Sequence, residues 1–309
     1  MCLGKEMDVS IIIVNYNTKD LLQNCINSIY KNVIDINYEI IVSDNGSTDG
    51  STEMIRESFP NVVLIENKKN LGFGAANNKG LKIAKGKYIF YLNSDTLLLN
   101  NAPKLFFDYW ENSKEKEKIG ALGTNLLNEN NQIIHSCANF PNLHSSILDL
   151  IKINIVNLGL SILYLFHVSG DIFRPKHLQN ETIGNVDYIT GADLFLLNNN
   201  DAKFDESFFL YYEETDLQKR MEKKGLKRIM IKGPIIKHLC GGSVGEGFNI
   251  KRKASFSRIQ FEVSRITYLK KHYNSKLFIF VIKLLISINW INPFIINNTR
   301  KYLQEIWSL

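Results

Sequence analysis

Short apolar runs alternate with amphipathic stretches through the first hundred residues of the chain. The run Val9–Val14 is apolar and β-branched except at Ser10, as expected for a strand buried on both faces of a parallel sheet. Apolar residues then recur at helical spacing from Lys19, so we expect a helix there with Thr18 as its cap. Three more strand-and-turn patterns follow, at 38–43, 62–65 and 87–92, separated by helices ending near 59 and 85.

This β-α-β-α-β-α-β order predicts an α/β fold. Its Rossmann-like, mostly parallel and twisted sheet is expected to have right-handed crossovers and flanking helices. Polar clusters follow the first, second and fourth strands at their carboxyl ends. Open α/β sheets bind ligands at that edge, so we expect the functional site there.

The second half of the chain is less regular. Strands are predicted over 120–135 and 186–197, and a short helix over 213–224. Two apolar stretches, 147–168 and 277–296, are interrupted by polar residues and lack the roughly 20 clean apolar residues of a membrane-spanning helix. In the second stretch, lysines and a serine share one helical face while large apolar residues cover the rest. The lysines are Lys276 and Lys283, and the serine is Ser287.

These patterns predict one large domain over residues 1–272, with an amphipathic, membrane-associating helical extension over 273–309. The large domain consists of a first half, residues 8–100, and a second half, residues 101–272, which includes the apolar insertion 143–168.

Composition narrows the class of protein. With 309 residues, 45% of them hydrophobic, the chain can bury a full core, which excludes disordered and fibrous classes. Its four cysteines form no CxxC pair, which argues against a disulfide framework or a four-cysteine zinc site. The first eight residues contain no apolar run. We therefore expect a cytoplasmic protein without a secretory signal, held on the inner face of the cell membrane.

The net charge of +6 is unevenly distributed. Residues 217–309 contain nineteen lysines and arginines against four acids, a net charge of +15, and the remainder carries −9. A basic third attracts nucleic acid, a diphosphate or an anionic membrane. Aromatic and basic residues are not interleaved there on a recognisable nucleic-acid-binding module, so we predict a membrane surface and no nucleic acid.

Six motifs occur in an order and spacing that chance does not explain. Together they resemble the family 2, GT-A fold glycosyltransferases, and within that family the rhamnosyltransferase-like branch of bacterial polysaccharide synthesis. The resemblance covers about residues 8–272. It implies that residues 8–100 form a nucleotide-binding half and residues 101–272 an acceptor-side half. The motifs are VSIIIVNYN at 9–17, VSDNGSTD at 42–49, NLGFGAANN at 70–78, LNSD at 92–95, TGA at 190–192 and FFLYYEETDL at 208–217.

The resemblance implies a donor-binding role for the first three polar clusters. Asp44 would accept the N3 hydrogen of a uracil or thymine ring, and the alternative is that it caps the next turn. Tyr16 and Asn17 would line the base pocket. Asn70 and Gly72 would let the backbone approach the ribose and diphosphate closely.

The segment Asn93-Ser94-Asp95 occupies the position of the family's Asp-x-Asp motif. Mg²⁺ or Mn²⁺ takes oxygen ligands, so Asp95 is the predicted metal ligand, and the alternative is a solvated strand-end acid. Asn93 adds no charge, but it and Ser94 can hydrogen-bond the donor. His238 matches a family position that reaches the metal or the diphosphate, although a structural histidine is equally compatible.

The family's catalytic base aligns with Glu214. A carboxylate opposite the leaving group takes the proton of the acceptor hydroxyl. Family members commonly carry an aspartate there, so Asp216 is kept as the reserve base. An acidic first turn that favours the helix dipole explains the same residues without chemistry. Arg252, Lys253 and Arg258 form either a basic segment that closes over the diphosphate or a solvated basic face.

The sequence therefore predicts an inverting, metal-dependent hexosyltransferase that uses a dTDP- or UDP-linked sugar. The motifs most resemble enzymes that use dTDP-rhamnose, with Phe208, Phe209 and Tyr211 as a candidate apolar wall for its methyl group. The acceptor would be a glycan or a lipid-linked molecule. The alternatives are an inert sugar-nucleotide-binding scaffold and a nucleotidyltransferase. The latter needs a glycine-rich basic loop after the first strand, where this chain has Asn15-Tyr16-Asn17-Thr18.

Overall fold

The computed structural model describes residues 6–165, 178–239, 256–290 and 299–309. The chain forms two compact units. The first consists of Met1–Phe140, His177–Phe209 and Glu213–Gly242, and the second of Pro141–Lys176, Leu210–Tyr212 and Ser243–Leu309. In this division, the described residues 143–165 and 256–272 group with the C-terminal helices, and the domain boundary after residue 272 stays a prediction.

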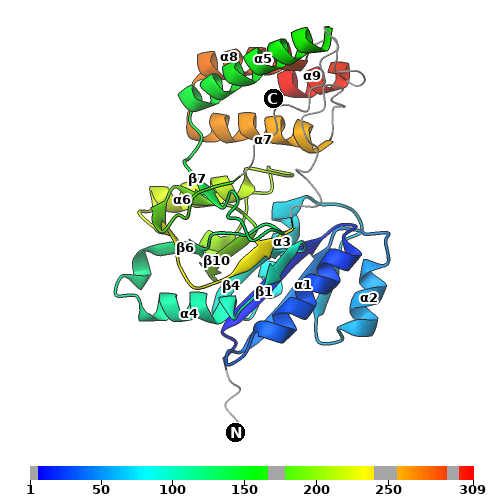
Figure 1. Ribbon diagram of the computed structural model, residues 1–309, viewed down its shortest axis with the longest axis vertical. Coiled ribbons are helices and arrows are strands. Elements are labelled where there is room, and N and C mark those ends of the chain that lie inside the picture. Colours follow the sequence, from blue (N-terminus) through cyan, green and yellow to red (C-terminus); the bar gives the residue numbers. More distant parts are fainter. Residues whose placement is uncertain (1–5, 166–177, 240–255, 291–298) are drawn as a thin grey trace. The chain divides into compact units, whose positions relative to one another are not determined.

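An eight-stranded, largely parallel sheet forms the centre of the first unit (Figure 1). The strand order is β3-β2-β1-β4-β10-β6-β11-β8. The strands are β1 Val9–Asn15, β2 Tyr38–Asp44, β3 Val63–Glu66, β4 Tyr88–Asn93, β6 Ile119–Gly123, β8 Gly184–Val186, β10 Asp193–Leu197 and β11 Lys227–Met230. The predicted parallel order of the first four strands is confirmed, and β10 and β8 pair antiparallel with their neighbours.

Five helices cover the two faces of this sheet. They are α1 Lys19–Asn32, α2 Ser51–Ser58, α3 Phe73–Ile83, α4 Ala102–Asn112 and α6 Glu213–Lys223. Alternate residues of β1 point to opposite faces, so Ile11 and Ile13 pack with α1, α2 and α4, whereas Ile12 packs on the side of α3 and α6. Burial on both faces explains the continuous apolar run of β1.

The capping hydrogen bond predicted for Thr18 at the start of α1 does not form. Thr18 does occupy the N-cap position, but its side chain makes no capping hydrogen bond to the helix. The hydroxyl donates to Asn15 Oδ1 at 2.6 Å, because a short polar side chain competes for nearby groups outside the helix.

The strands predicted at 120–135 and 186–197 are broken into shorter pieces. Strand β6 ends at Gly123, and the segment after it forms loops and isolated bridges before β7, Cys137–Ala138. In the other segment, β9 (Tyr188–Ile189) separates β8 from β10 and pairs with β7. A further antiparallel pair joins β5 (Thr96–Leu98) to β12 (Ile236–His238). Cys25 and Cys137 are buried free thiols.

The second unit is helical. Its helices are α5 Leu143–Leu165, α7 Phe256–His272, α8 Lys276–Trp290 and α9 Thr299–Ser308, and α8 packs against the other three. Asn154 of α5 donates to the Leu285 carbonyl of α8 at 3.1 Å, and Trp307 of α9 donates to Ser287 at 3.0 Å. In the residues that the structure describes, no helix is long and apolar enough to cross a membrane.

Candidate active site

The carboxyl ends of β1, β2 and β4 lie next to each other and bring the predicted polar clusters together. Asn15 lies opposite Asp44, and Val14 lies opposite Asn93. Asp44 is buried, with 1% of its surface exposed. Its Oδ2 accepts a hydrogen bond from Asn15 at 2.7 Å, and its Oδ1 accepts from the backbone N–H groups of Gly46 and Ser47. The carboxylate therefore stabilises its own turn, as the capping alternative expects, and its role in binding a base stays a prediction.

The loops after β1 and β2 are tied to each other. Asn17 adopts a left-handed backbone conformation, with φ of 53°, and its side-chain oxygen accepts from the Thr48 N–H at 2.8 Å. Its own N–H donates to Ser47 Oγ. Tyr16 directly precedes Asn17 in this hydrogen-bonded loop, and 49% of its surface is exposed. The structure thus leaves the Tyr16 ring at the surface of this sheet edge.

Asn70 and Gly72 stabilise the turn before α3. Asn70 Oδ1 accepts from the Gly72 N–H at 2.9 Å and from the Asn45 side chain at 3.2 Å. Gly72 has φ of 88°, and a Cβ atom there would lie 2.2 Å from the Phe209 carbonyl oxygen. The close approach that requires glycine at position 72 is therefore to the protein backbone, and the donor-binding role of Gly72 stays a prediction.

The strand pair β5–β12 brings His238 to the Asn93-Ser94-Asp95 turn. His238 Nε2 lies 3.1 Å from Asp95 Oδ1, and the two side chains are 19% and 15% exposed. The backbone carbonyl of Asp95 accepts from the Leu239 N–H at 2.8 Å, which holds the two segments in register. Asn93 Nδ2 lies 3.5 Å from the same histidine nitrogen. Ser94 is buried and its hydroxyl hydrogen-bonds that of Thr18 at 3.0 Å.

This group of side chains fits a divalent cation. Asp95 contributes a carboxylate and His238 an imidazole nitrogen, and both ligand types suit Mn²⁺, while Mg²⁺ relies on the oxygens. Asn93 Oδ1 is buried and has no hydrogen-bond partner among the described residues, so it is a third candidate ligand. No cluster of three or more His, Cys, Asp or Glu side chains suited to a metal occurs in the described ranges. The remaining ligands would therefore come from the diphosphate and from water.

Asp193, a buried acid at the start of β10, was not among the residues predicted from the sequence. Its Oδ2 accepts from the Thr124 N–H at 2.8 Å, and its Oδ1 has no partner among the described side chains and backbone groups. Burial raises the pKa of Asp193 well above its ordinary value, and the nearby His238 opposes the shift. An acid heading an otherwise apolar strand is costly to bury, and that signal was available in the sequence.

Two adjacent glutamates occupy the first turn of α6. Glu213 is buried, and burial followed by repulsion from Glu214 raises its pKa well above the usual range. Glu214 is partly buried, and desolvation raises its pKa as well. Gly191 lies against this residue, because a Cβ atom at 191 would be 3.5 Å from Glu214 Cβ. The TGA motif therefore adjoins the predicted base.

Asp216, the reserve base, has a different environment. It is fully buried and its Oδ2 accepts from Arg220 Nε at 3.0 Å in an ion pair. Gln218, which the sequence analysis also missed, bonds both the N–H and the carbonyl of Ile189 and the carbonyl of Glu214. Asp216 and Gln218 thus anchor α6, and Glu214 is the acid of this turn that remains partly exposed.

Two strained tyrosines precede α6. Tyr211 and Tyr212 have φ of 70° and 67°, in the left-handed region that costs a residue with a side chain about 1–3 kcal/mol. Both rings pack on Phe261 of α7, and Ser264 donates to the Leu210 carbonyl at 2.8 Å. This packing within the second unit holds the strained segment that leads directly into Glu213.

Other predicted residues lie elsewhere. Arg252 and Lys253 are outside the described residues, and Arg258 lies on α7, where burial lowers its pKa. Phe208 is 1% exposed and belongs to the interior, so it cannot form a wall for a sugar. Phe209 contributes its backbone carbonyl to the Gly72 turn.

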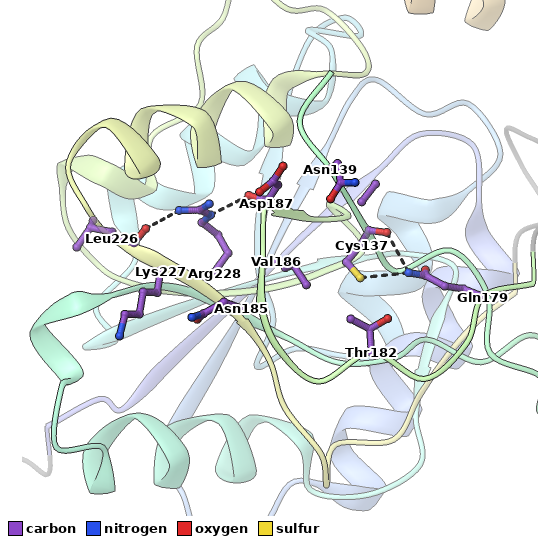
Figure 2. Close-up of a pocket in the computed structure, with 11 residues that line it drawn as sticks. Cys137, Asn139, Gln179, Thr182, Asn185, Val186, Asp187, Leu226, Lys227 and Arg228 are labelled. Carbon is purple, nitrogen blue, oxygen red and sulfur yellow. Dashed lines mark hydrogen bonds between the residues drawn. The ribbon is translucent and has the colours of Figure 1, made fainter. Parts of the chain in front are cut away.

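A cavity of about 710 Å³ lies at the β11–β8 end of the sheet (Figure 2). Arg228 lines the cavity and donates to the backbone carbonyls of Asp187 and Leu226, while Gln179 donates to the backbone carbonyl of Cys137. The other lining residues are Ala138, Asn139, Thr182, Asn185, Val186 and Lys227. No predicted site residue lines this cavity, so it is distinct from the cluster at the strand ends.

Part of the chain is similar in sequence to known glycosyltransferases. Residues 10–123 match the family model described as Glycosyl transferase family 2. A segment covering 38% of the chain is 36% identical to a poly(ribitol-phosphate) beta-glucosyltransferase of Bacillus spizizenii, of which it spans 19%. A similar segment, also 38% of the chain, is 35% identical to the UDP-Glc:alpha-D-GlcNAc-diphosphoundecaprenol beta-1,3-glucosyltransferase WfaP of Escherichia coli, of which it spans 41%.

A solved structure extends the likeness to the whole fold. The mannosyltransferase PcManGT of Pyrobaculum calidifontis, in complex with GDP-Man and Mn²⁺, superposes with a TM-score of 0.53 at 13% identity. The match covers 99% of this chain and 74% of that protein. The predicted α/β fold is confirmed, and residues 10–123 are similar in sequence to family 2 glycosyltransferases. The matched segments span less than half of the length of these two relatives.

Proposed function

We propose that the protein is an inverting glycosyltransferase that moves a sugar from a nucleoside diphosphate onto a hydroxyl of an acceptor. One observation carries the proposal. The polar residues at the ends of β1, β2 and β4, together with the His238–Asp95 pair, form a cluster on a chain whose residues 10–123 match family 2 glycosyltransferases.

Asp95 and His238 would hold the divalent cation, with Asn93 as a neighbouring oxygen donor. When bound there, a cation would offset the charge that develops on the departing nucleoside diphosphate. Asp193 is a buried acid whose raised pKa is opposed by the nearby His238. The mannosyltransferase neighbour was crystallised with Mn²⁺, which supports a metal-dependent reaction in this fold.

Glu214 would act as the catalytic base. It accepts the proton of the acceptor hydroxyl while that oxygen bonds to the anomeric carbon and the bond from this carbon to the phosphate oxygen breaks. A raised pKa makes Glu214 a stronger base than an ordinary carboxylate. The alternative base, Asp216, is fully buried in its ion pair with Arg220, which favours Glu214.

The donor that we put first is dTDP-rhamnose, followed by UDP-hexoses. The order rests on the motifs at 70–74, 92–95 and 208–217. Asp44 would accept the N3 hydrogen that thymine and uracil share. The relative WfaP is named for UDP-glucose, so both bases belong in the test.

The acceptor would be a glycan or a lipid-linked molecule of cell-surface polysaccharide synthesis. The names of the two curated relatives support this class, since one acts on poly(ribitol phosphate) and the other on a diphosphoundecaprenol-linked sugar. An inert sugar-nucleotide-binding scaffold is the rival. It predicts binding of nucleotide without turnover.

A donor panel tests the proposal. The purified chain is incubated with Mn²⁺ and dTDP-rhamnose, UDP-glucose or GDP-mannose, and release of nucleoside diphosphate is followed. We expect release from a dTDP- or UDP-linked sugar that stops when the metal is chelated. Nucleotide binding without release from any donor, in the presence of candidate acceptors, would favour the scaffold.

A further inference from the structure

Helices α5 and α8 lie side by side in the second unit (Figure 1). The ring of His144 contacts that of Phe278 with centroids 5.3 Å apart, and ten residues further along α5 the Asn154 side chain donates to the Leu285 carbonyl. Contact therefore proceeds in the same direction along both helices. The two helices form a parallel pair.

Each helix of the pair exposes a stripe of large apolar side chains. The α5 stripe consists of Leu148, Ile151, Ile155 and Leu158, and the α8 stripe of Leu277, Phe280, Leu284 and Ile288. Spacings of three and four residues place each set on one helical face, along roughly 15 Å of helix. Exposure reaches 65% at Ile155 and 70% at Leu277. Two adjacent stripes of this size exceed the scattered apolar residues of an ordinary protein surface.

The opposite face of α8 packs within the helical unit. Ile279, Ile282 and Ile286 are buried within the helical unit. The packing of α8 therefore uses these isoleucines, and the exposed stripe is additional apolar surface. The sequence predicted a membrane-facing role for α8 alone. The structure shows that α5, in the insertion 143–168, exposes a similar apolar stripe.

Charge distinguishes the possible occupants of this surface. The two helices carry three lysines and one acid. Lys276 and Lys283 flank the α8 stripe, Lys152 flanks the α5 stripe, and the acid, Asp149, lies close enough to Arg265 of α7 to raise its pKa. An isologous dimer would bring the lysines of two copies together, whereas anionic lipid headgroups would neutralise them.

We propose that the parallel stripes of α5 and α8 form a docking face for an anionic bilayer surface. The apolar side chains enter the boundary between headgroups and acyl chains, and the lysines contact the phosphates. Trp307 supports the edge of the face, because its ring lies 5.7 Å from Lys283 Nζ, its indole N–H donates to Ser287, and it is 43% exposed. Docking is independent of glycosyl transfer, and it would bring the chain to a lipid-linked acceptor.

Vesicle flotation of the full chain tests the docking face. We expect the protein to float with vesicles of phosphatidylcholine and phosphatidylglycerol, to float weakly with phosphatidylcholine alone, and to lose binding as salt rises. Ile155→Glu and Leu284→Glu should each lower the partition coefficient by roughly tenfold or more. Replacing Lys152 or Lys276 with glutamine should lower it roughly fivefold on anionic vesicles only.

Ile34→Glu is the matched control, because Ile34 is 60% exposed and belongs to the first unit. Circular dichroism checks that each variant is folded, and the exposed positions make this the expected result. Absence of vesicle binding by the wild-type chain, or equal binding by wild type and Ile155→Glu, would overturn the proposal. A dimer that Ile155→Glu dissociates, without vesicle binding, would show that a second copy covers the face.

Discussion

Asp95 and Glu214 are both acids at the end of a secondary structure element, but their surroundings differ. Asp95 follows β4 and lies 3.1 Å from an imidazole nitrogen. Glu214 begins α6 beside a second glutamate, and burial raises its pKa. A carboxylate beside a potential ligand partner is suited to hold a cation, whereas a desolvated carboxylate is suited to accept a proton. In the proposed reaction, Asp95 would therefore hold the cation and Glu214 would accept the proton.

The largest expected effect follows from removing the charge at the strand end. Asp95→Asn should abolish metal-dependent turnover, because it leaves no carboxylate in the Asn93-Ser94-Asp95 turn. Donor turnover across a Mn²⁺ titration measures the effect. Ser113→Ala, in a loop on the same unit, is the control. Near-normal activity of the aspartate variant would remove Asp95 from the metal site.

Glu214→Gln should lower turnover by roughly 10²- to 10⁴-fold, the range typical of a lost general base. The glutamine keeps the shape of the side chain but cannot take the acceptor proton. Asp216→Asn is the comparison, and it should act mainly on stability, because the change breaks the buried pair with Arg220. Steady-state kinetics and thermal melts of both variants separate the two roles. A larger catalytic loss in the folded Asp216 variant would exchange the assignments.

Only part of the fold around these acids could be predicted from the sequence. The strands β1, β2, β3 and β4 follow from local apolar runs, because burial on both faces leaves a continuous signal in the sequence. The β5–β12 pairing that brings His238 to the strand end could not be read this way, since Asn93 and His238 are 145 positions apart. No local pattern encodes such a pairing.

The site shows the same limit. Sequence motifs indicated Asp95 and Glu214 through their resemblance to a family, but they did not indicate that Gly72 accommodates the Phe209 carbonyl or that Arg220 engages Asp216. The helical unit was the least predictable part. The amphipathic pattern of α8 was visible, but its pairing with α5 across the intervening domain depends on tertiary packing.

The pH dependence of turnover should sharpen the assignment of the base. Because desolvation raises the pKa of Glu214, the residue becomes protonated and inactive at a higher pH than an ordinary glutamate, whose pKa is about 4.3. The acid limb of kcat/KM is therefore expected above that value. A profile that stays flat down to the ordinary glutamate range would contradict a desolvated base.

Glu213→Gln should have the smallest effect, an increase in stability. The raised pKa means that the folded state binds a proton more tightly than the unfolded state, so stability falls as pH rises from about 4.3 through the folded-state pKa. Glutamine removes this loss. A gain of about 1 kcal/mol would raise the melting temperature by about 2–4 °C near neutral pH and by little below about pH 4. A lower melting temperature at neutral pH would show that the ionised glutamate is stabilised in the fold.

The central claim is that Asp95 holds the metal and Glu214 accepts the proton. It is tested most directly by isothermal titration of dTDP and UDP, with Mn²⁺, into the wild-type, Asp95→Asn and Glu214→Gln proteins. We predict that Glu214→Gln binds one of these nucleotides with an affinity close to that of the wild type, although it barely turns over. Asp95→Asn should lose the part of the affinity that depends on Mn²⁺. Equal metal-dependent binding by the wild type and Asp95→Asn, or loss of binding in Glu214→Gln, would contradict the account.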